Sequence, residues 1–253
     1  MNHITLEEFH RLAGKKKVQA AVRRALICDG GSYDDFIEQL YQDLDEVIFD
    51  LQSTVEMRQK DGEDRITTDI LSKLKVDGYQ ATHDSKTGGH VDLSIRLGDE
   101  HSWIGEAKKD GNFKEGFLQL TSRYVQASGN FAHNHGGILL YLVKTPDAKS
   151  RLTGWRQTVE SEGATCEDCA KNVLAFYSTH KLAGSGTDLK IRTMAVALYH
   201  KPLDKSARTV QAKKAAKKGS SSPSKKTAST AKKTAARVAK QTSLNASTAA
   251  SPT

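Results

Sequence analysis

The sequence lacks three features that would assign it to well-known classes of protein. No run of residues approaches the roughly 18 consecutive apolar positions that a transmembrane helix requires. The first residues, MNHITLEEFHRLAGKKK, contain no apolar core of the kind found in signal peptides. The 253 residues include three cysteines, which is too few for the framework of a disulfide-rich secreted domain. We therefore expect a soluble cytoplasmic protein with no membrane partner, associated with the nucleoid if the source is bacterial.

Acidic residues are absent from the last part of the chain. Residues 205–253 contain twelve Lys or Arg and no Asp or Glu, whereas residues 1–204 contain 26 basic and 30 acidic residues. The net charge of +8 therefore comes from the tail, and the preceding chain has an ordinary globular composition. We take 204–253 as a disordered tail, because its Lys, Ala and Ser cannot bury enough apolar surface to fold alone. Such a tail binds phosphates without reading sequence; the alternative is a segment that only increases solubility.

Apolar residues in the first 60 positions recur at helical spacing. Residues 4–27 are expected to form two helical pieces divided at Gly14. A longer amphipathic helix is expected to follow Ser32, a favourable N-cap residue, and to run to Val55. Its other face is strongly acidic and is expected to face solvent, although it could also hold the tail or a basic partner. We take 1–60 as a helical region packed on the domain that follows.

From residue 61 the pattern alternates between helices and strands. The elements expected, in chain order, are a helix around 66–74, a strand at 79–84, a hairpin at 91–108, a helix at 114–127, a strand at 138–143, a helix at 147–162 and extended segments at 173–180 and 191–200. The strand at 138–143 is continuously apolar, which is typical of a strand buried on both faces. The prediction is therefore an α/β core at 61–203 with a mixed sheet flanked by helices, to which the last strands are added.

The hairpin at 90–109, HVDLSIRLGDEHSWIGEAKK, carries charged residues where a strand seldom has them. Alternating apolar residues fix its register, and folding it about Asp99 places Asp92 opposite Glu106. Lys108 lies two residues further on the same face of the sheet. Because Asp and Glu are poor strand formers and repel each other, this pairing indicates a function. Mg²⁺ prefers such oxygen ligands. The alternative is an exposed sheet face that merely carries charges.

These residues resemble the signature of the PD-(D/E)xK nuclease superfamily, also called restriction-endonuclease-like. The signature is an Asp on one strand followed by Glu-x-Lys on the next, matched here by Asp92, Glu106 and Lys108. The Pro that precedes the Asp in the family is replaced by Val91. The order helix, three strands, helix, strand over residues 61–143 also resembles the common core of the family. The resemblance implies a restriction-endonuclease-like fold and a nuclease that hydrolyses phosphodiester bonds.

The resemblance also implies roles for individual residues. Asp92 and Glu106 would hold Mg²⁺, for which Mn²⁺ could substitute, and the carbonyl of Ala107 would complete the ligand shell. Glu63 would join them through water, because the family often has an acidic residue on this first core helix. Lys108 would orient the attacking water or stabilise developing negative charge. Gln119 would lie near the site; some relatives have a Gln-x-x-x-Tyr pair here, whereas the same spacing leads from Gln119 to an arginine.

The partner implied is nucleic acid, DNA before RNA, and a homodimer would allow both strands to be cut. Two other functions stay open. One is a non-catalytic nucleic-acid-binding or chromatin-associated protein that keeps the nuclease-like fold; the other is an interaction module whose acidic helix binds a basic partner. The pair Cys166 and Cys169 could hold zinc, but a structural site needs four ligands, so two reduced thiols are the simpler prediction. His133 and His135 are expected in a turn.

Overall fold

The structure, a computed structural model, describes residues 13–83, 85–86, 90–124, 134–182 and 185–202, with the single positions 5, 7, 11 and 204. The chain divides into two units, Met1–His200 and Lys201–Thr253. The first unit is described below. Most of the second, with the predicted basic tail, lies outside the described residues.

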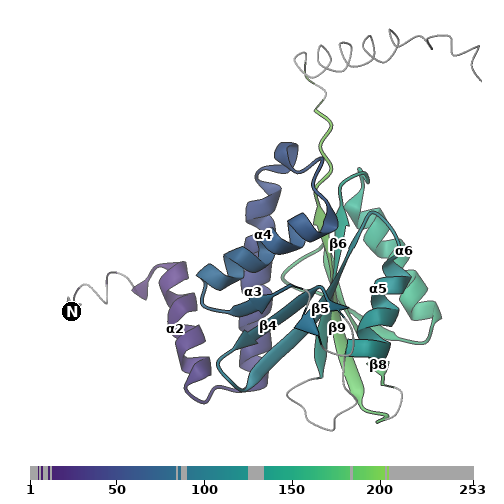
Figure 1. Ribbon diagram of the computed structural model, residues 1–253. Helices are drawn as coiled ribbons and strands as arrows, with labels where there is room; N and C mark the ends of the chain where they lie inside the picture. Colours follow the sequence, from purple (N-terminus) through teal and green to yellow (C-terminus); the bar gives the residue numbers. More distant parts are fainter. Residues whose placement is uncertain are drawn as a thin grey trace, which may run out of the picture. The chain divides into compact units, whose positions relative to one another are not determined.

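A seven-stranded mixed sheet forms the centre of the first unit (Figure 1). Its strands, in spatial order, are β1 (Gln80–Thr82), β4 (Leu93–Leu97), β5 (His101–Lys109), β6 (His135–Leu142), β9 (Asp188–Ala197), β8 (Ala175–Lys181) and β7 (Thr165–Asp168). β6 runs parallel to both of its neighbours, and the other four pairs are antiparallel. A separate small ladder joins β2 (Ser85–Lys86) to β3 (His90–Val91). The α/β class and the extension of the sheet by the later strands are confirmed.

Helices flank the sheet on both faces. They are α2 (Lys16–Cys28), α3 (Tyr33–Gln52), the 3-10 turn η1 (Val55–Met57), α4 (Glu63–Val76), α5 (Phe113–Gln119), the π-helical segment η2 (Leu120–Tyr124) and α6 (Ala148–Ser161). A helix was predicted at 114–127. Its α-helical part stops at Gln119, where the π-helical segment η2 begins. The capping prediction for the long helix is confirmed, because the Ser32 hydroxyl accepts a hydrogen bond from the Asp35 N–H and the Asp35 carboxylate accepts one from the Ser32 N–H.

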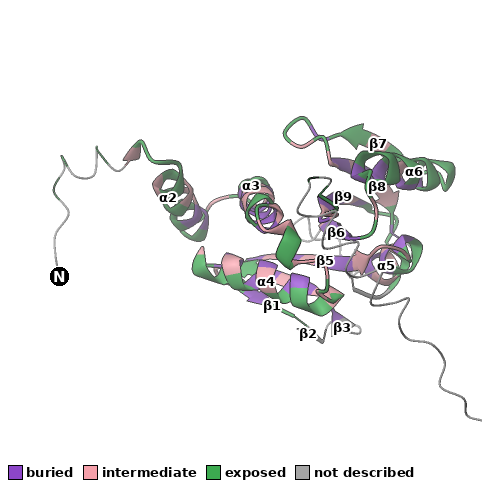
Figure 2. Ribbon diagram, turned by 90° about the horizontal axis from the view of Figure 1, so that it is seen from above, coloured by how far each residue is buried: buried purple, intermediate pink, exposed green. Residues whose placement is uncertain are grey.

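Two hydrophobic clusters form the core, one on each face of the sheet. α2, α3 and α4 pack on one face, and α5 and α6 pack on the other, as Figure 2 shows from above. β6 contributes Leu139 and Tyr141 to the first cluster and Ile138, Leu140 and Leu142 to the second. This division explains the continuous apolar run of the strand, since both of its faces are covered.

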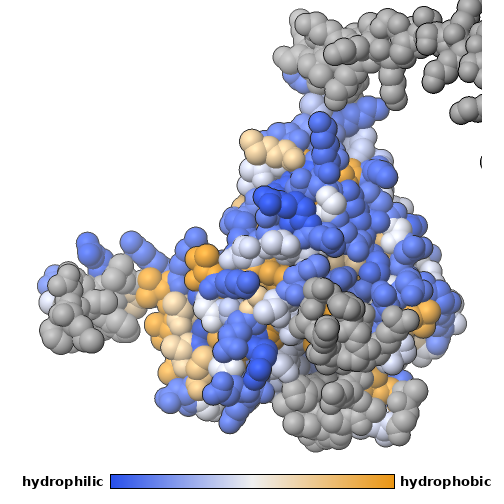
Figure 3. Space-filling model, in the orientation of Figure 1, coloured by the Kyte–Doolittle hydropathy of each residue, from blue (hydrophilic) through white to orange (hydrophobic). Residues whose placement is uncertain are grey.

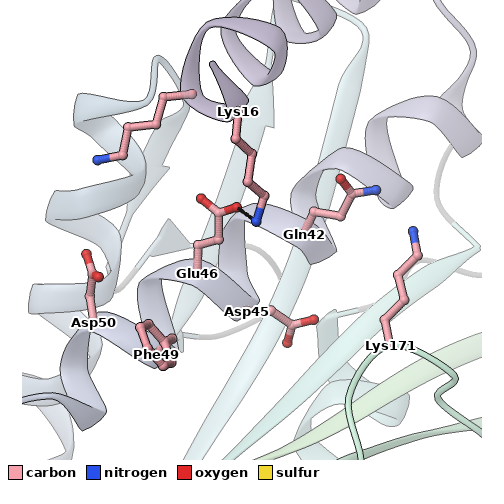
Figure 4. A pocket seen from close by; sticks show the side chains of 8 residues that line it. Lys16, Gln42, Asp45, Glu46, Phe49, Asp50 and Lys171 are labelled. Atoms are coloured by element: carbon pink, nitrogen blue, oxygen red, sulfur yellow. Dashed lines mark ion pairs between the residues drawn. The ribbon is translucent and has the colours of Figure 1, made fainter. Parts of the chain in front are cut away.

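Basic side chains of α2 pair with acidic side chains of α3. Lys16 reaches Glu46, as Figure 4 shows, and Arg23 binds Glu38 at 2.7 Å. The expectation that Asp43 faces solvent is wrong: its side chain is 4% exposed and accepts hydrogen bonds from Arg24, Gln39 and Tyr79. α2 covers this part of α3, so much of the acidic face is already neutralised within the chain.

The surface over α2 is the least hydrophilic part of the face drawn in Figure 3, and its exposed apolar side chains are Val22 and Leu26. Among the described residues, no helix has the length and apolar character needed to cross a lipid bilayer.

Two glycines make room for Trp103 in the first cluster. Gly105 in β5 and Gly137 in β6 are partners in the parallel ladder. A methyl group at Gly137 would lie 2.2 Å from Cζ2 of Trp103, and one at Gly105 would lie 2.5 Å from its Cη2. The strand was predicted to start at residue 138, but it starts at His135. The glycines before residue 138 belong to the strand because they pair with β5 beneath the indole of Trp103.

We expect Gly137→Ala to lower the free energy of unfolding by about 1–3 kcal/mol, because the added methyl group overpacks a site already filled by the indole. Denaturant unfolding followed by Trp fluorescence measures this difference. Gly154→Ala in α6 is the matched control, since a Cβ there meets no atom within 4 Å. The control should stabilise the protein by up to about 1 kcal/mol. Equal stability of the two variants would contradict the packing of Trp103 described here.

Candidate active site

The hairpin has the register that the apolar pattern predicts. Leu93 pairs with Gly105 and Leu97 with His101, so Asp92 and Glu106 are the next opposed positions beyond the ladder. Asp92 itself lies at a bend between β3 and β4 rather than within a strand. Its Oδ2 accepts a hydrogen bond of 3.0 Å from the Ala107 N–H. The bend therefore turns the carboxylate toward the backbone of β5.

Glu106 and Lys108 form the centre of the site. The Lys108 Nζ lies 2.6 Å from Glu106 Oε1 and 3.7 Å from Asp92 Oδ2. The Glu106 side chain is 2% exposed, and its Oε2 is buried with no hydrogen-bond partner among the described residues. A buried carboxylate oxygen without a partner is costly, so this atom is suited to a ligand that the protein alone does not supply.

Glu63 reaches the same site from the other side of the sheet. It is the first residue of α4, where the helix dipole favours negative charge. Its Oε2 accepts a hydrogen bond of 2.6 Å from the Lys109 N–H, and its Oε1 lies 3.9 Å from the Lys108 Nζ. The structure therefore brings together the carboxylates of Asp92, Glu106 and Glu63, which come from three separate segments of the chain.

Burial and crowding alter the proton affinities of these groups. Burial away from water raises the pKa of Glu106 to about 7, and neighbouring Asp92 adds to the rise, although the hydrogen bond from Lys108 opposes it. Burial also raises the pKa of Glu63. For Lys108, burial acts to lower the pKa, but Glu106, Asp92 and Glu63 outweigh it and raise it above its ordinary value. One ammonium group thus faces three carboxyl groups, an excess of negative charge that favours a further cation.

The donor set fits a hard divalent cation. Asp92, Glu106 and Glu63 offer carboxylate oxygens. The carbonyl of Ala107 points to the same side of β5 as its N–H, which bonds Asp92, because both groups of a strand residue face one neighbour. Among the described residues, no three His, Cys, Asp or Glu side chains already lie in a metal-holding group. The Lys108 ammonium lies between these carboxylates, so a cation would enter by moving it.

α5 packs over the hairpin at a glycine. A Cβ on Gly116 would lie 2.8 Å from Cγ of Lys108 and 3.2 Å from Cγ of Glu106. Gln119 is one turn later on the same face of α5, and its Oε1 is buried without a partner among the described residues. Sequence reasoning missed Gly116; the signal available was a glycine inside a helical pattern.

A π-helical segment follows Gln119 directly. The side chains of Arg123 and Tyr124, which follow Gln119 by four and five residues, lie outside the described part of the structure.

A second group that sequence reasoning missed lies under the site. The Tyr141 hydroxyl, in β6, is 2.9 Å from the Thr67 hydroxyl, in α4. Burial raises the pKa of Tyr141 strongly, and the charges of Asp92 and Glu63 add to the effect. The pair therefore fixes α4, and with it Glu63, to the sheet.

The cysteines and histidines do not form a metal centre in the described structure. Cys166 packs in the cluster on the α6 face and Cys169 in the cluster on the α3 face, because three residues of extended chain turn them to opposite sides. Both thiols are free. His135 starts β6, bonds Asn134, and burial lowers its pKa to about 4. His133 lies outside the described residues.

Comparison with protein-family models, curated proteins and solved structures found no match to the chain.

Proposed function

We propose that the chain is a metal-dependent nuclease of the PD-(D/E)xK type, hydrolysing phosphodiester bonds in DNA. The observation that carries the proposal is the convergence of Asp92, Glu106 and Lys108 with Glu63, in the register that places the two hairpin acids opposite each other. The element order α4, β1, β4, β5, α5 and β6 supports a restriction-endonuclease-like core around this site.

The carboxylates would hold Mg²⁺ or Mn²⁺, with Asp92, Glu106 and the Ala107 carbonyl as direct ligands and Glu63 joined through water. Such an ion polarises the phosphate and lowers the pKa of bound water. Asp92 is preorganised for this task because the Ala107 N–H fixes its second oxygen. Glu63 is held in the same way by the Lys109 N–H. The backbone of β5 thus orients both outer acids before any ligand binds.

Lys108 would supply the positive charge that the reacting phosphate needs. In the present arrangement its ammonium neutralises Glu106 at 2.6 Å. With a cation bound to the carboxylates, the ammonium would be free to donate a hydrogen bond to the attacking water or to the developing charge on the phosphate. The flexible stem of a lysine permits this movement, and the lack of a side chain at Gly116 lets the stem pass close to α5.

The cationic tail, residues 205–253, would add affinity for nucleic acid that does not depend on base sequence. Specificity would then be left to the domain. A homodimer stays part of the proposal, since two copies would cut both strands.

The test is cleavage of supercoiled plasmid and of single-stranded DNA in Mg²⁺, Mn²⁺ or EDTA. We expect metal-dependent cleavage by the wild-type protein and a loss of about 10²–10³-fold for Lys108→Ala, the usual effect of removing one charge-stabilising donor. Lys73→Ala is the matched control, because Lys73 lies on α4 and pairs with Asp50, away from the hairpin. No cleavage by pure wild-type protein in any metal would refute the nuclease proposal.

One observation favours a second function, a non-catalytic nucleic-acid-binding protein with the same fold. The Lys108 ammonium already bridges the acids, so the cluster is partly neutralised without metal. This alternative requires DNA binding that is indifferent to Mg²⁺ and depends on the tail. The third function, a module whose acidic helix binds a basic partner, is weakened because Glu38, Asp43 and Glu46 are already paired.

A further inference from the structure

A cavity of about 270 Å³ lies between the beginning of α5 and the outer face of α6. We call it the α5–α6 cavity. Its lining residues are Asn112, Phe113, Lys114, Arg151, Gly154, Trp155 and Thr158. Figure 1 shows the two helices side by side on the face of the sheet that α2, α3 and α4 leave open. The cavity therefore lies on the same face as the Gly116 contact with the hairpin.

The α5–α6 cavity differs in the charge of its lining residues from three other cavities in the described part of the protein. The α5–α6 cavity has two cationic side chains and no carboxylate. The cavity in Figure 4 contains Asp45, Glu46 and Asp50 beside its lysines, and the remaining two contain four acidic residues each. Each of those three cavities has three cationic residues that its acidic residues balance or outnumber, so a polyanion is attracted to the α5–α6 cavity before the others.

The two cations of the cavity are available to a ligand. The Arg151 guanidinium lies 4.7 Å from the centre of the Phe113 ring and has no carboxylate partner among the described residues. Lys114 pairs with Glu162 at 2.6 Å, but both side chains are exposed, so the pair contributes little and can exchange for another anion. The aromatic ring beneath the guanidinium also fixes the plane of the guanidinium, which favours binding of a phosphate.

Trp155 forms a wall of the cavity, and the residue is 6% exposed. Its ring is fixed edge-on by Phe113 and Phe117. Beside it, Gly154 leaves open space, since a Cβ there would meet nothing within 4 Å.

We propose that the α5–α6 cavity binds a backbone phosphate of the nucleic acid substrate and so positions the strand across α5 relative to the catalytic hairpin. This inference rests on the proposed nuclease function for the identity of the ligand. The hairpin contacts α5 at Gly116, and the cavity uses Phe113 and Lys114 of the same helix. An α-helix is about 10 Å across, so phosphates a few nucleotides apart can occupy both places.

The experiment measures binding of a fluorescein-labelled 20-base-pair duplex by anisotropy, in EDTA, over a range of salt concentrations. All proteins are full-length and carry Glu106→Gln, so no strand is cut and the tail contributes equally. Gly154→Glu is compared with Gly154→Gln, which fills the same space without charge. Both residues form helices better than glycine, so α6 is retained. Arg151→Gln is the third variant.

We expect Gly154→Glu to bind at least 10-fold more weakly than Gly154→Gln. Arg151→Gln should reduce the slope of log K against log salt concentration by about 0.9, the value for one lost phosphate contact. Equal affinities for the two Gly154 variants, together with an unchanged slope for Arg151→Gln, would overturn the proposal.

The cleavage assay separates this proposal from the nuclease proposal. If the wild-type protein cuts DNA, and Arg151→Gln alone binds and cuts like wild type, the cavity is not a phosphate site although the nuclease function stands. If Arg151→Gln and Gly154→Glu weaken binding but no variant with intact Glu106 cuts in any metal, the phosphate site stands and the hairpin is not a nuclease site.

Discussion

Glu106→Gln is expected to lower metal-dependent DNA cleavage by about 10³-fold. The substitution keeps the volume of a side chain that is 2% exposed, but removes the negative charge that would hold the cation. Stabilisation of the transition state by a bound metal ion contributes several kcal/mol, and about 1.4 kcal/mol corresponds to a factor of ten in rate. Initial rates of plasmid nicking at saturating Mg²⁺ measure the loss.

The control for Glu106→Gln is DNA affinity in EDTA, which should change by less than about twofold, because neither the tail nor the α5–α6 cavity contains Glu106. Glu115→Gln, an exposed change on α5, should leave cleavage intact. Cleavage by Glu106→Gln at the wild-type rate would show that the hairpin does not hold the catalytic metal.

Glu106 also predicts how stability depends on pH in the absence of metal. Its pKa is about 7 in the folded protein, above its ordinary value of 4.5, so the folded state keeps the proton that the unfolded state loses. Stability therefore falls as pH rises from about 4.5 to 7. Glu106→Gln removes this penalty, which amounts to at most about 3 kcal/mol. We expect the variant to match wild type at pH 4.5 and to exceed it at pH 8, measured by urea unfolding in EDTA. Parallel pH profiles of the two proteins would contradict the burial of an ionisable group here.

Asp45→Asn is expected to be strongly destabilising, lowering the free energy of unfolding by about 3–5 kcal/mol. Asp45 Oδ2 lies 2.7 Å from Arg192 Nη2, and the Arg192 side chain is 1% exposed. The guanidinium otherwise donates to the Tyr41 carbonyl and contacts sulfur atoms of Met194 and Cys169. Removing the carboxylate leaves a buried cation without a counter-charge.

The double variant Asp45→Asn, Arg192→Met tests this explanation by denaturant unfolding. Replacing the whole buried pair is often close to neutral, so the double variant should recover most of the stability lost by Asp45→Asn alone. A double variant as unstable as the sum of the two single variants would mean that the residues act independently and that the loss has another cause.

The hairpin could be predicted from sequence because its determinants are local. Alternating apolar residues on both arms and a single turn fixed the register, and the pairing of Leu93 with Gly105 confirms it. The bend that removes Asp92 from the ladder could not be predicted, because it depends on β3 pairing with β2 instead of continuing β4. The place of Glu63 near the site was implied by the family resemblance, whereas its bond to the Lys109 N–H could not be predicted.

Long-range contacts account for most of what the sequence did not reveal. Arg192 and Asp45 are 147 positions apart, and no local pattern marks either residue as half of a buried pair. Arg24 is buried against Asp43, 19 positions away, because α2 packs on α3. β7 was not predicted, since its four residues are largely exposed and lack an apolar alternation. In each case the structure depends on a contact with another part of the chain, and the local sequence does not identify that part.

The parallel placement of β6 between β5 and β9 also sets an order of events during synthesis. The hairpin can close as soon as β5 is made, but β6 keeps one open edge until residues 188–197 leave the ribosome. At 5–20 residues per second, the interval between the end of β6 and the start of β9 is roughly 2–9 s. During that time one edge of an apolar strand stays unpaired and can pair with another chain. The positively charged residues 205–253 follow β9 in the chain, so they are translated only after the whole sheet has been synthesised.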